Sequence, residues 1–102
     1  MKNISVEDLK KRIDANEAIH LIDVREELEH EDYNIGGLNF KLRRMQDMAI
    51  EEIEHLKNEE VICYCRSGHR SNMACLILEH LGFTNTVNVT GGVIAWQEKF
   101  GK

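Results

Sequence analysis

The sequence contains no proline, only three cysteines and no apolar run long enough to cross a membrane. With 42% hydrophobic and 30% charged residues, its composition is typical of a globular chain rather than a disordered one. An odd number of cysteines argues against the disulfide framework of small secreted domains. Residues 1–5 show no apolar segment that could serve as a signal peptide. We therefore expect free thiols in a reducing, cytoplasmic setting.

Positive charge is also scarce, because the net charge is -5 and acidic residues gather in residues 26–32 and 51–60. Such a balance argues against nucleic acid or an anionic membrane as a partner. Against this acidic background, a small basic cluster formed by Arg66, His69 and Arg70 stands out.

Apolar periodicity divides the chain into alternating strands and helices. Short apolar runs predict strands at residues 19–24, 38–40, 61–64 and 87–89. Helical spacing predicts helices over residues 5–13, 26–31, 45–56, 71–81 and 91–100. Such alternation is typical of the α/β class, with a mostly parallel sheet and helices on both faces. At 102 residues, the chain suits one domain, residues 1–102.

Three segments that carry polar or glycine residues follow predicted strands. They are Asp23 with Arg25, the loop that begins at Cys65, and the pair Gly91-Gly92. In an open parallel sheet, the functional crevice lies beyond the carboxyl ends of the strands. We therefore expect these three segments to converge on one side of the molecule.

The loop after the third predicted strand has the features of an anion-binding site with a nucleophile. Cys65 ends an apolar run and faces the start of a predicted helix, where a thiol is most easily ionised. Ser67 and Gly68 can form a tight curve whose backbone N–H groups bind an anion. Arg66 and Arg70 can add charge-assisted hydrogen bonds to an oxyanion. The residues predict a cysteine nucleophile in an anion-binding loop.

The spacing in this loop favours a small group on the cysteine. Four residues separate Cys65 from Arg70, and Ser71 follows. In phosphate-handling cysteine enzymes, the arginine comes one residue later. The shorter loop makes a smaller cradle, which suits a cysteine that has gained one sulfur atom better than a phosphoryl group.

The sequence resembles the rhodanese family, in particular its single-domain sulfurtransferases. The resemblance spans nearly the whole chain and rests on three motifs: Asp23-Val24-Arg25-Glu26, Cys65-Arg66-Ser67-Gly68-His69-Arg70 with Ser71 after it, and Gly91-Gly92 before Trp96. It implies a five-stranded sheet flanked by helices, with no metal and no cofactor. It also implies that a donor such as thiosulfate leaves a persulfide on Cys65, which cyanide, a cellular thiol or a sulfur-relay protein then takes up.

The resemblance also implies the roles of the site residues. Cys65 would be catalytic, and the loop from Arg66 to Ser71 (Arg66, Ser67, Gly68, His69, Arg70 and Ser71) would bind the substrate. Asp23 and Arg25 could act in catalysis, but we favour a structural ion pair that supports the loop. The chain departs from the family where Gly-His-Ile-Pro-Gly-Ala is common, because it reads Tyr33-Asn34-Ile35-Gly36-Gly37-Leu38 there. The missing proline removes a rigid turn and adds backbone entropy that folding must overcome.

Several residues have other interpretations. Cys63 lies on the same strand face as Cys65, so it could form a redox pair with it, although packing in the core is favoured. Cys75 is expected in the core, and a metal site that includes it lacks a recognisable ligand spacing. His69 could tune Cys65 or could simply be exposed.

Two other functions compete with sulfur transfer. The chain could be an interaction or sensor module that keeps the fold without catalysis, although Cys65 argues against this. It could also be a cysteine-dependent phosphatase or arsenate reductase. The loop length and the absence of an arginine at Ser71 disfavour that class.

Overall fold

A five-stranded parallel sheet forms the centre of the computed structural model, which describes all 102 residues. The strands are β1 (Lys2–Ile4), β2 (His20–Asp23), β3 (Leu38–Asn39), β4 (Glu60–Tyr64) and β5 (Asn85–Val89). They lie in the order β1-β5-β4-β2-β3, and every neighbouring pair is parallel. The α/β class and the mostly parallel sheet predicted from the sequence are confirmed.

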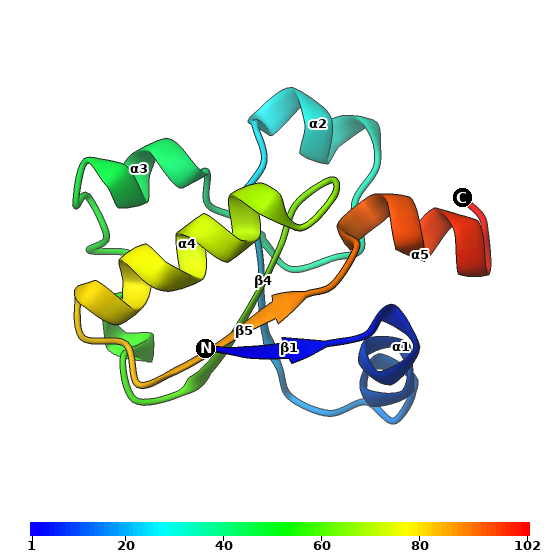
Figure 1. Cartoon of the computed structure of the whole chain (residues 1–102), viewed down its shortest axis with the longest axis horizontal. Helices are drawn as coiled ribbons and strands as arrows, with labels where there is room; N and C mark the ends of the chain where they lie inside the picture. Colours follow the sequence, from blue (N-terminus) through cyan, green and yellow to red (C-terminus); the bar gives the residue numbers. More distant parts are fainter.

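Helices cover both faces of this sheet. On one side lie α1 (Val6–Asp14) and α5 (Gly92–Phe100), on the other α3 (Leu42–Gln46) and α4 (His69–His80), and α2 (Glu27–Asp32) lies beyond the carboxyl end of β2 (Figure 1). Two apolar clusters fill the spaces between sheet and helices. Cys63 and Leu78 belong to the cluster beneath α4, whereas Ile62 and Leu9 belong to the cluster beneath α1. None of the helices combines the length and the apolar character that crossing a bilayer requires.

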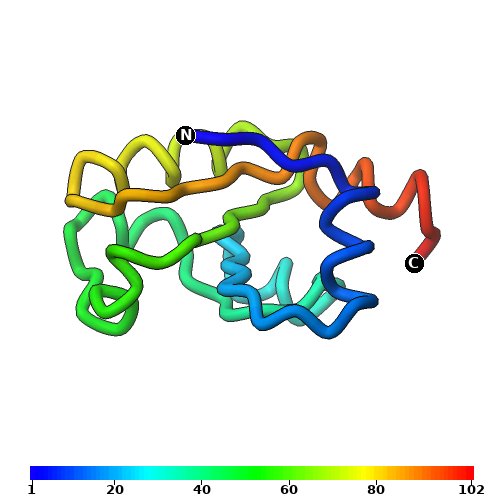
Figure 2. The backbone as a smooth tube through the Cα atoms, turned by 90° about the horizontal axis from the view of Figure 1, so that it is seen from below, coloured from blue at the N-terminus to red at the C-terminus, as the bar shows by residue number.

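The amino-terminal strand β1 has no counterpart among the strands predicted from the sequence. It has three residues, of which Lys2 and Asn3 are exposed, so no apolar alternation marks it. It pairs with β5 in a register that runs from Lys2 opposite Val87 to Ile4 opposite Val89. The backbone tube shows the two strands side by side (Figure 2). Long-range pairing, rather than local pattern, makes this segment a strand.

The single helix predicted over residues 45–56 is wrong. The structure has the short helix α3, a turn in which Met48 has a φ of 58°, and a 3₁₀ helix over Glu54–Leu56. Met48, which lies inside the predicted helix, is 67% exposed. Met45 and the next buried residue, Ile50, are five positions apart, which is longer than the helical repeat. A turn therefore brings both side chains to the core, where a continuous helix would not.

The segment that lacks the family's proline is held by a tyrosine of the central strand. The hydroxyl of Tyr64 accepts a hydrogen bond from the backbone N–H of Ile35 at 3.1 Å and donates one to the carbonyl of Gly36 at 2.8 Å. Gly37 has a φ of 83°, and a Cβ at this position would collide with the backbone of Leu21. These contacts fix the turn without a proline ring.

Candidate active site

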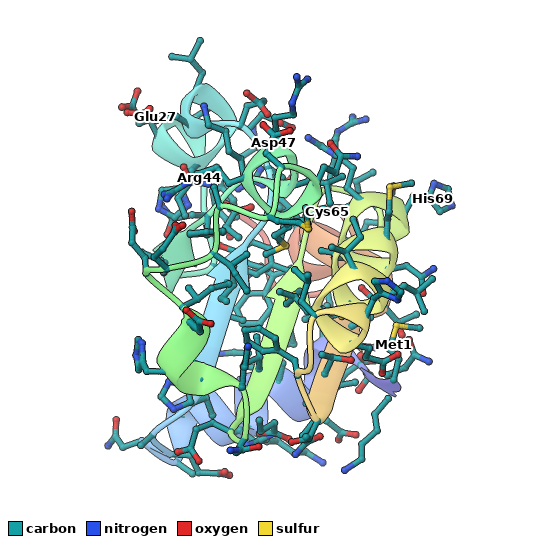
Figure 3. The ribbon with its side chains drawn as sticks, turned by 90° about the vertical axis from the view of Figure 1, so that its left-hand side faces the viewer. Met1, Glu27, Arg44, Asp47, Cys65 and His69 are labelled. Atoms are coloured by element: carbon teal, nitrogen blue, oxygen red, sulfur yellow. The ribbon has the colours of Figure 1, made fainter.

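Cys65 lies directly beyond the carboxyl end of β4, at the start of the loop that leads into α4. Figure 3 shows it at the end of the strand, with His69 pointing away from it into solvent. Cys65 is 1% exposed. Helix α4 begins at His69, two residues before the predicted start at Ser71, because Gly68 serves as its N-cap with a φ of 106°. Ser71 therefore lies in the first turn of the helix, where it is buried.

Hydrogen-bond donors surround the sulfur of Cys65. The backbone N–H of Gly68 donates to Sγ at 3.1 Å, and the hydroxyl of Ser71 lies 3.4 Å from it. Burial raises the pKa of the Cys65 thiol. Hydrogen bonds from the hydroxyl and backbone N–H of Ser71 and from the backbone N–H groups of Gly68 and Ser67 outweigh this effect and bring the pKa below its ordinary value. The loop therefore favours a thiolate.

Ser71 connects Cys65 to strand β5 through a residue that the sequence analysis missed. Its single hydroxyl proton has three acceptors in reach, because the oxygen lies 3.2 Å from the carbonyl oxygen of Gly68 and 2.5 Å from Oδ1 of Asn88 as well as 3.4 Å from Sγ, and a thiolate competes for it with its negative charge. Asn88 is 7% exposed and lies opposite Cys63 in the β4–β5 register. Its position near the carboxyl end of a parallel strand is the signal that could have identified it.

Replacement of Ser71 by alanine is expected to raise the pKa of Cys65, because a hydrogen bond that favours the thiolate is lost. Alkylation of Cys65 by iodoacetamide at neutral pH should then slow by roughly fivefold to tenfold. Its pH profile should shift to higher pH. The matched control is Ser67→Ala, since Ser67 bonds the sulfur only through its backbone N–H. Equal alkylation rates for Ser71→Ala and the control would contradict the role of the hydroxyl.

The amino end of α5 holds the other side of the loop. The backbone N–H of Val93 donates to the carbonyl of Cys65 at 2.9 Å, and that of Ile94 donates to the carbonyl of Arg66 at 3.0 Å. Gly92 has a φ of 54°, and a Cβ there would collide with both of these carbonyl groups. The predicted approach of Gly91-Gly92 to the Cys65 loop is confirmed. The N–H groups of α5 bind the carbonyl groups of the loop, which leaves N–H groups of the loop to face the sulfur.

The two arginines of the loop are placed differently. Arg70 forms a bidentate ion pair with Glu29 of α2, with N–O distances of 2.7 and 2.9 Å. Arg66 is exposed and makes no ion pair. It lines a cavity of about 250 Å³ between the loop, α2 and α5, which Arg25 and Gln97 also line. Arg66 and Lys102 are the cations of this cavity that form no ion pair, and Asp32 also lines it.

Asp23 and Arg25 form the ion pair expected from the sequence. Both are buried, and the guanidinium donates to both carboxylate oxygens, the shortest bond being 2.8 Å. Arg25 also donates to the carbonyl of Tyr33, and His30 lies 2.8 Å from Asp23. These contacts lead to α2 and the turn after it rather than to the Cys65 loop. Any support for the loop therefore passes through α2, which carries Glu29.

The model of the rhodanese-like domain matches residues 5–99. The chain belongs to the rhodanese-like domain family. It is 42% identical over 99 residues to YtwF of Bacillus subtilis, whose name assigns it provisionally to the sulfurtransferases. The matched region covers 95% of this chain and 91% of YtwF. A protein of Allochromatium vinosum named sulfurtransferase is 32% identical over 96 residues, with 94% of this chain and 88% of that one covered.

Solved structures agree with the fold of this rhodanese-like domain. A rhodanese-like domain protein from Staphylococcus aureus superposes with a TM-score of 0.81 at 29% identity, covering 94% of this chain and 91% of that one. The five-stranded sheet that the sequence resemblance implied is therefore confirmed.

The other two cysteines of this rhodanese-like domain lie in its core. Cys63 and Cys75 are fully buried, and all three thiols are free. A hydrogen bond with Cys75 and burial together raise the pKa of Cys63 well above its ordinary value. The core positions predicted for both residues are confirmed. No three histidine, cysteine or acidic side chains are grouped so that they could hold a metal ion.

Proposed function

We propose that this rhodanese-like domain is a sulfurtransferase that carries a sulfane sulfur on Cys65. The observation that carries the proposal is the set of donors around Sγ, namely the N–H of Gly68 at 3.1 Å and the hydroxyl of Ser71 at 3.4 Å. Such donors favour a thiolate, which is the nucleophilic form of cysteine. The sulfurtransferase names of YtwF and of the Allochromatium vinosum protein support the same reaction class.

The reaction has two half-reactions that leave the protein unchanged. First, the Cys65 thiolate attacks the outer sulfur of a donor such as thiosulfate. A new S–S bond forms while the donor's S–S bond breaks, and sulfite leaves with the bonding electron pair. Second, cyanide or the thiolate of an acceptor attacks the outer sulfur of the persulfide, and the Cys65 thiolate leaves. Sulfur moves from donor to acceptor by covalent catalysis, and the balance requires no further reactant.

The residues of the loop have distinct parts in this proposal. The N–H groups of Ser67 and Gly68 and the hydroxyl of Ser71 stabilise the anionic sulfur. Arg66 attracts the sulfonate end of an anionic donor, and Arg70 can bind it only in competition with Glu29. His69 is exposed at the rim. A small thiol or a sulfur-relay protein can serve as the acceptor.

Phosphoryl transfer fits the loop less well. A phosphorylated cysteine is a dianion that needs cationic partners. Arg70 is already neutralised by Glu29, and the following position holds the buried Ser71 instead of an arginine. We therefore favour sulfur transfer over phosphatase or arsenate reductase activity.

The direct test is intact-mass measurement of the wild-type protein after incubation with thiosulfate. We expect the mass to rise by one sulfur atom and to return to its original value when cyanide is added, with thiocyanate formed in equal amount. A protein that gains no sulfur from thiosulfate or from a thiosulfonate would contradict the proposal. Hydrolysis of a phosphate ester that depends on Cys65 would favour the alternative.

A further inference from the structure

The ion pair between Arg70 and Glu29 joins the start of α4 to α2. Each terminal nitrogen of the guanidinium bonds one oxygen of the carboxylate. The bond to Arg70 lowers the pKa of Glu29 to about 2, so the carboxylate stays charged throughout the neutral range. About a third of each side chain is exposed, so solutes can reach the pair. Arg70 lies in the first turn of the helix that follows the Cys65 loop.

This pair determines how much positive charge the loop offers to an anion. Without Glu29, Arg70 would present a full cation next to the loop. With Glu29 in place, the net charge of the pair is zero. Arg25, which lies beyond it, is likewise neutralised by Asp23. Arg66 and Lys102 are left as the unpaired cations of the cavity that can attract an anionic donor.

We propose that Glu29 is a specificity-determining residue that lowers the preference of this domain for dianionic sulfur donors. The inference rests on the proposed sulfur transfer. A donor with two negative charges must compete with Glu29 for Arg70 and is repelled by its carboxylate. A donor with one negative charge loses less from that repulsion. The site therefore favours sulfane donors of low charge, such as the persulfide of a small thiol or of a protein, over inorganic thiosulfate.

The test compares two donors that differ in charge but carry sulfur on a similar sulfonyl group. Thiosulfate is a dianion and loses sulfite, whereas methanethiosulfonate is a monoanion and loses methanesulfinate. For Glu29→Gln, we expect kcat/KM with thiosulfate to rise roughly fivefold, as for loss of one exposed charge–charge contact. With methanethiosulfonate it should change about twofold or less. The ratio of kcat/KM with thiosulfate to kcat/KM with methanethiosulfonate is the measurement that tests the role of Glu29.

The chain supplies a matched control. Glu27→Gln removes the same charge from the same short helix, but Glu27 forms no hydrogen bond or ion pair. We expect it to leave the donor ratio unchanged. In the native protein, the backbone N–H of Glu26 donates a hydrogen bond to the Glu29 side chain at 3.1 Å. The amide oxygen of Glu29→Gln can accept the same bond, so the helix cap is kept. In an Arg70→Gln background the carboxylate of Glu29 is unpaired and still repels a dianion, so Glu29→Gln should still raise the ratio.

Several outcomes would overturn the inference. An unchanged donor ratio in Glu29→Gln would do so, and so would an equal rise of that ratio in Glu27→Gln. An equal loss of kcat/KM with both donors in Glu29→Gln would mean that the ion pair only holds the loop in place. Protection of Cys65 from alkylation by sulfate, at constant ionic strength, gives a test without turnover, and Glu29→Gln should need less sulfate than the wild type. If neither donor loads Cys65, the proposed function fails. If both load it and neither readout responds, only the inference about Glu29 fails.

Discussion

Replacement of Cys65 by serine is expected to abolish sulfur transfer. A hydroxyl of nearly the same size keeps the loop hydrogen bonds but is a far weaker nucleophile than a thiolate and cannot form a persulfide. Intact-mass measurement after incubation with thiosulfate should show no added sulfur, and thiocyanate formation should fall to the uncatalysed rate. Thermal unfolding should show that the variant is folded.

The other thiols provide the control for this result. Cys75→Ala removes a free cysteine from the core but leaves Cys65 and its donors in place. It should still gain one sulfur atom, although its stability should fall because a buried side chain is shortened. A Cys65→Ser protein that still gained sulfur would place the carrier on another residue and would overturn the proposed mechanism.

Replacement of Arg25 by methionine is expected to cost about 3 kcal/mol of unfolding free energy. Asp23 has no exposed surface, and the substitution leaves its carboxylate with only the backbone N–H of residue 25 and the ring of His30 as partners. A buried charge without its ion-pair partner is strongly destabilising. The carbonyl of Tyr33 also loses a donor. Urea unfolding measures the change, and a loss of sulfur transfer at temperatures where the variant is folded would show that α2 supports the loop.

Arg12→Met is the matched control for the buried pair. It makes the same change in side chain and charge, but Arg12 is 27% exposed and its partners, Glu17 and Glu60, remain hydrated. The expected cost is at most about 1 kcal/mol. If the two substitutions destabilise the protein equally, burial of the Asp23–Arg25 pair has no special importance for the fold.

The candidate site was predictable wherever one short segment contains the necessary chemistry. Cys65 follows an apolar run, and Gly68 and the arginines follow it directly, so local order alone indicates a nucleophile in an anion-binding loop. The buried strands β2, β4 and β5 were also predictable, because a parallel strand covered on both faces is a short apolar run. The structure of residues 45–56 was not predictable, because apolar residues there recur at nearly helical spacing. The five-residue step from Met45 to Ile50 breaks that spacing but is easily overlooked.

The sequence by itself determined the class of fold, the candidate nucleophile and the segments that converge on it, because strand ends and their polar residues are local in the chain. Only the tertiary structure decided which groups those residues meet. It showed that Ser71 reaches Asn88 on another strand, that Glu29 neutralises Arg70, and that the amino end of α5 takes the loop carbonyls. The physical reason is that a hydrogen bond or ion pair depends on distance in space, and no pattern along the chain records which distant side chains the packed core will bring within about 3 Å.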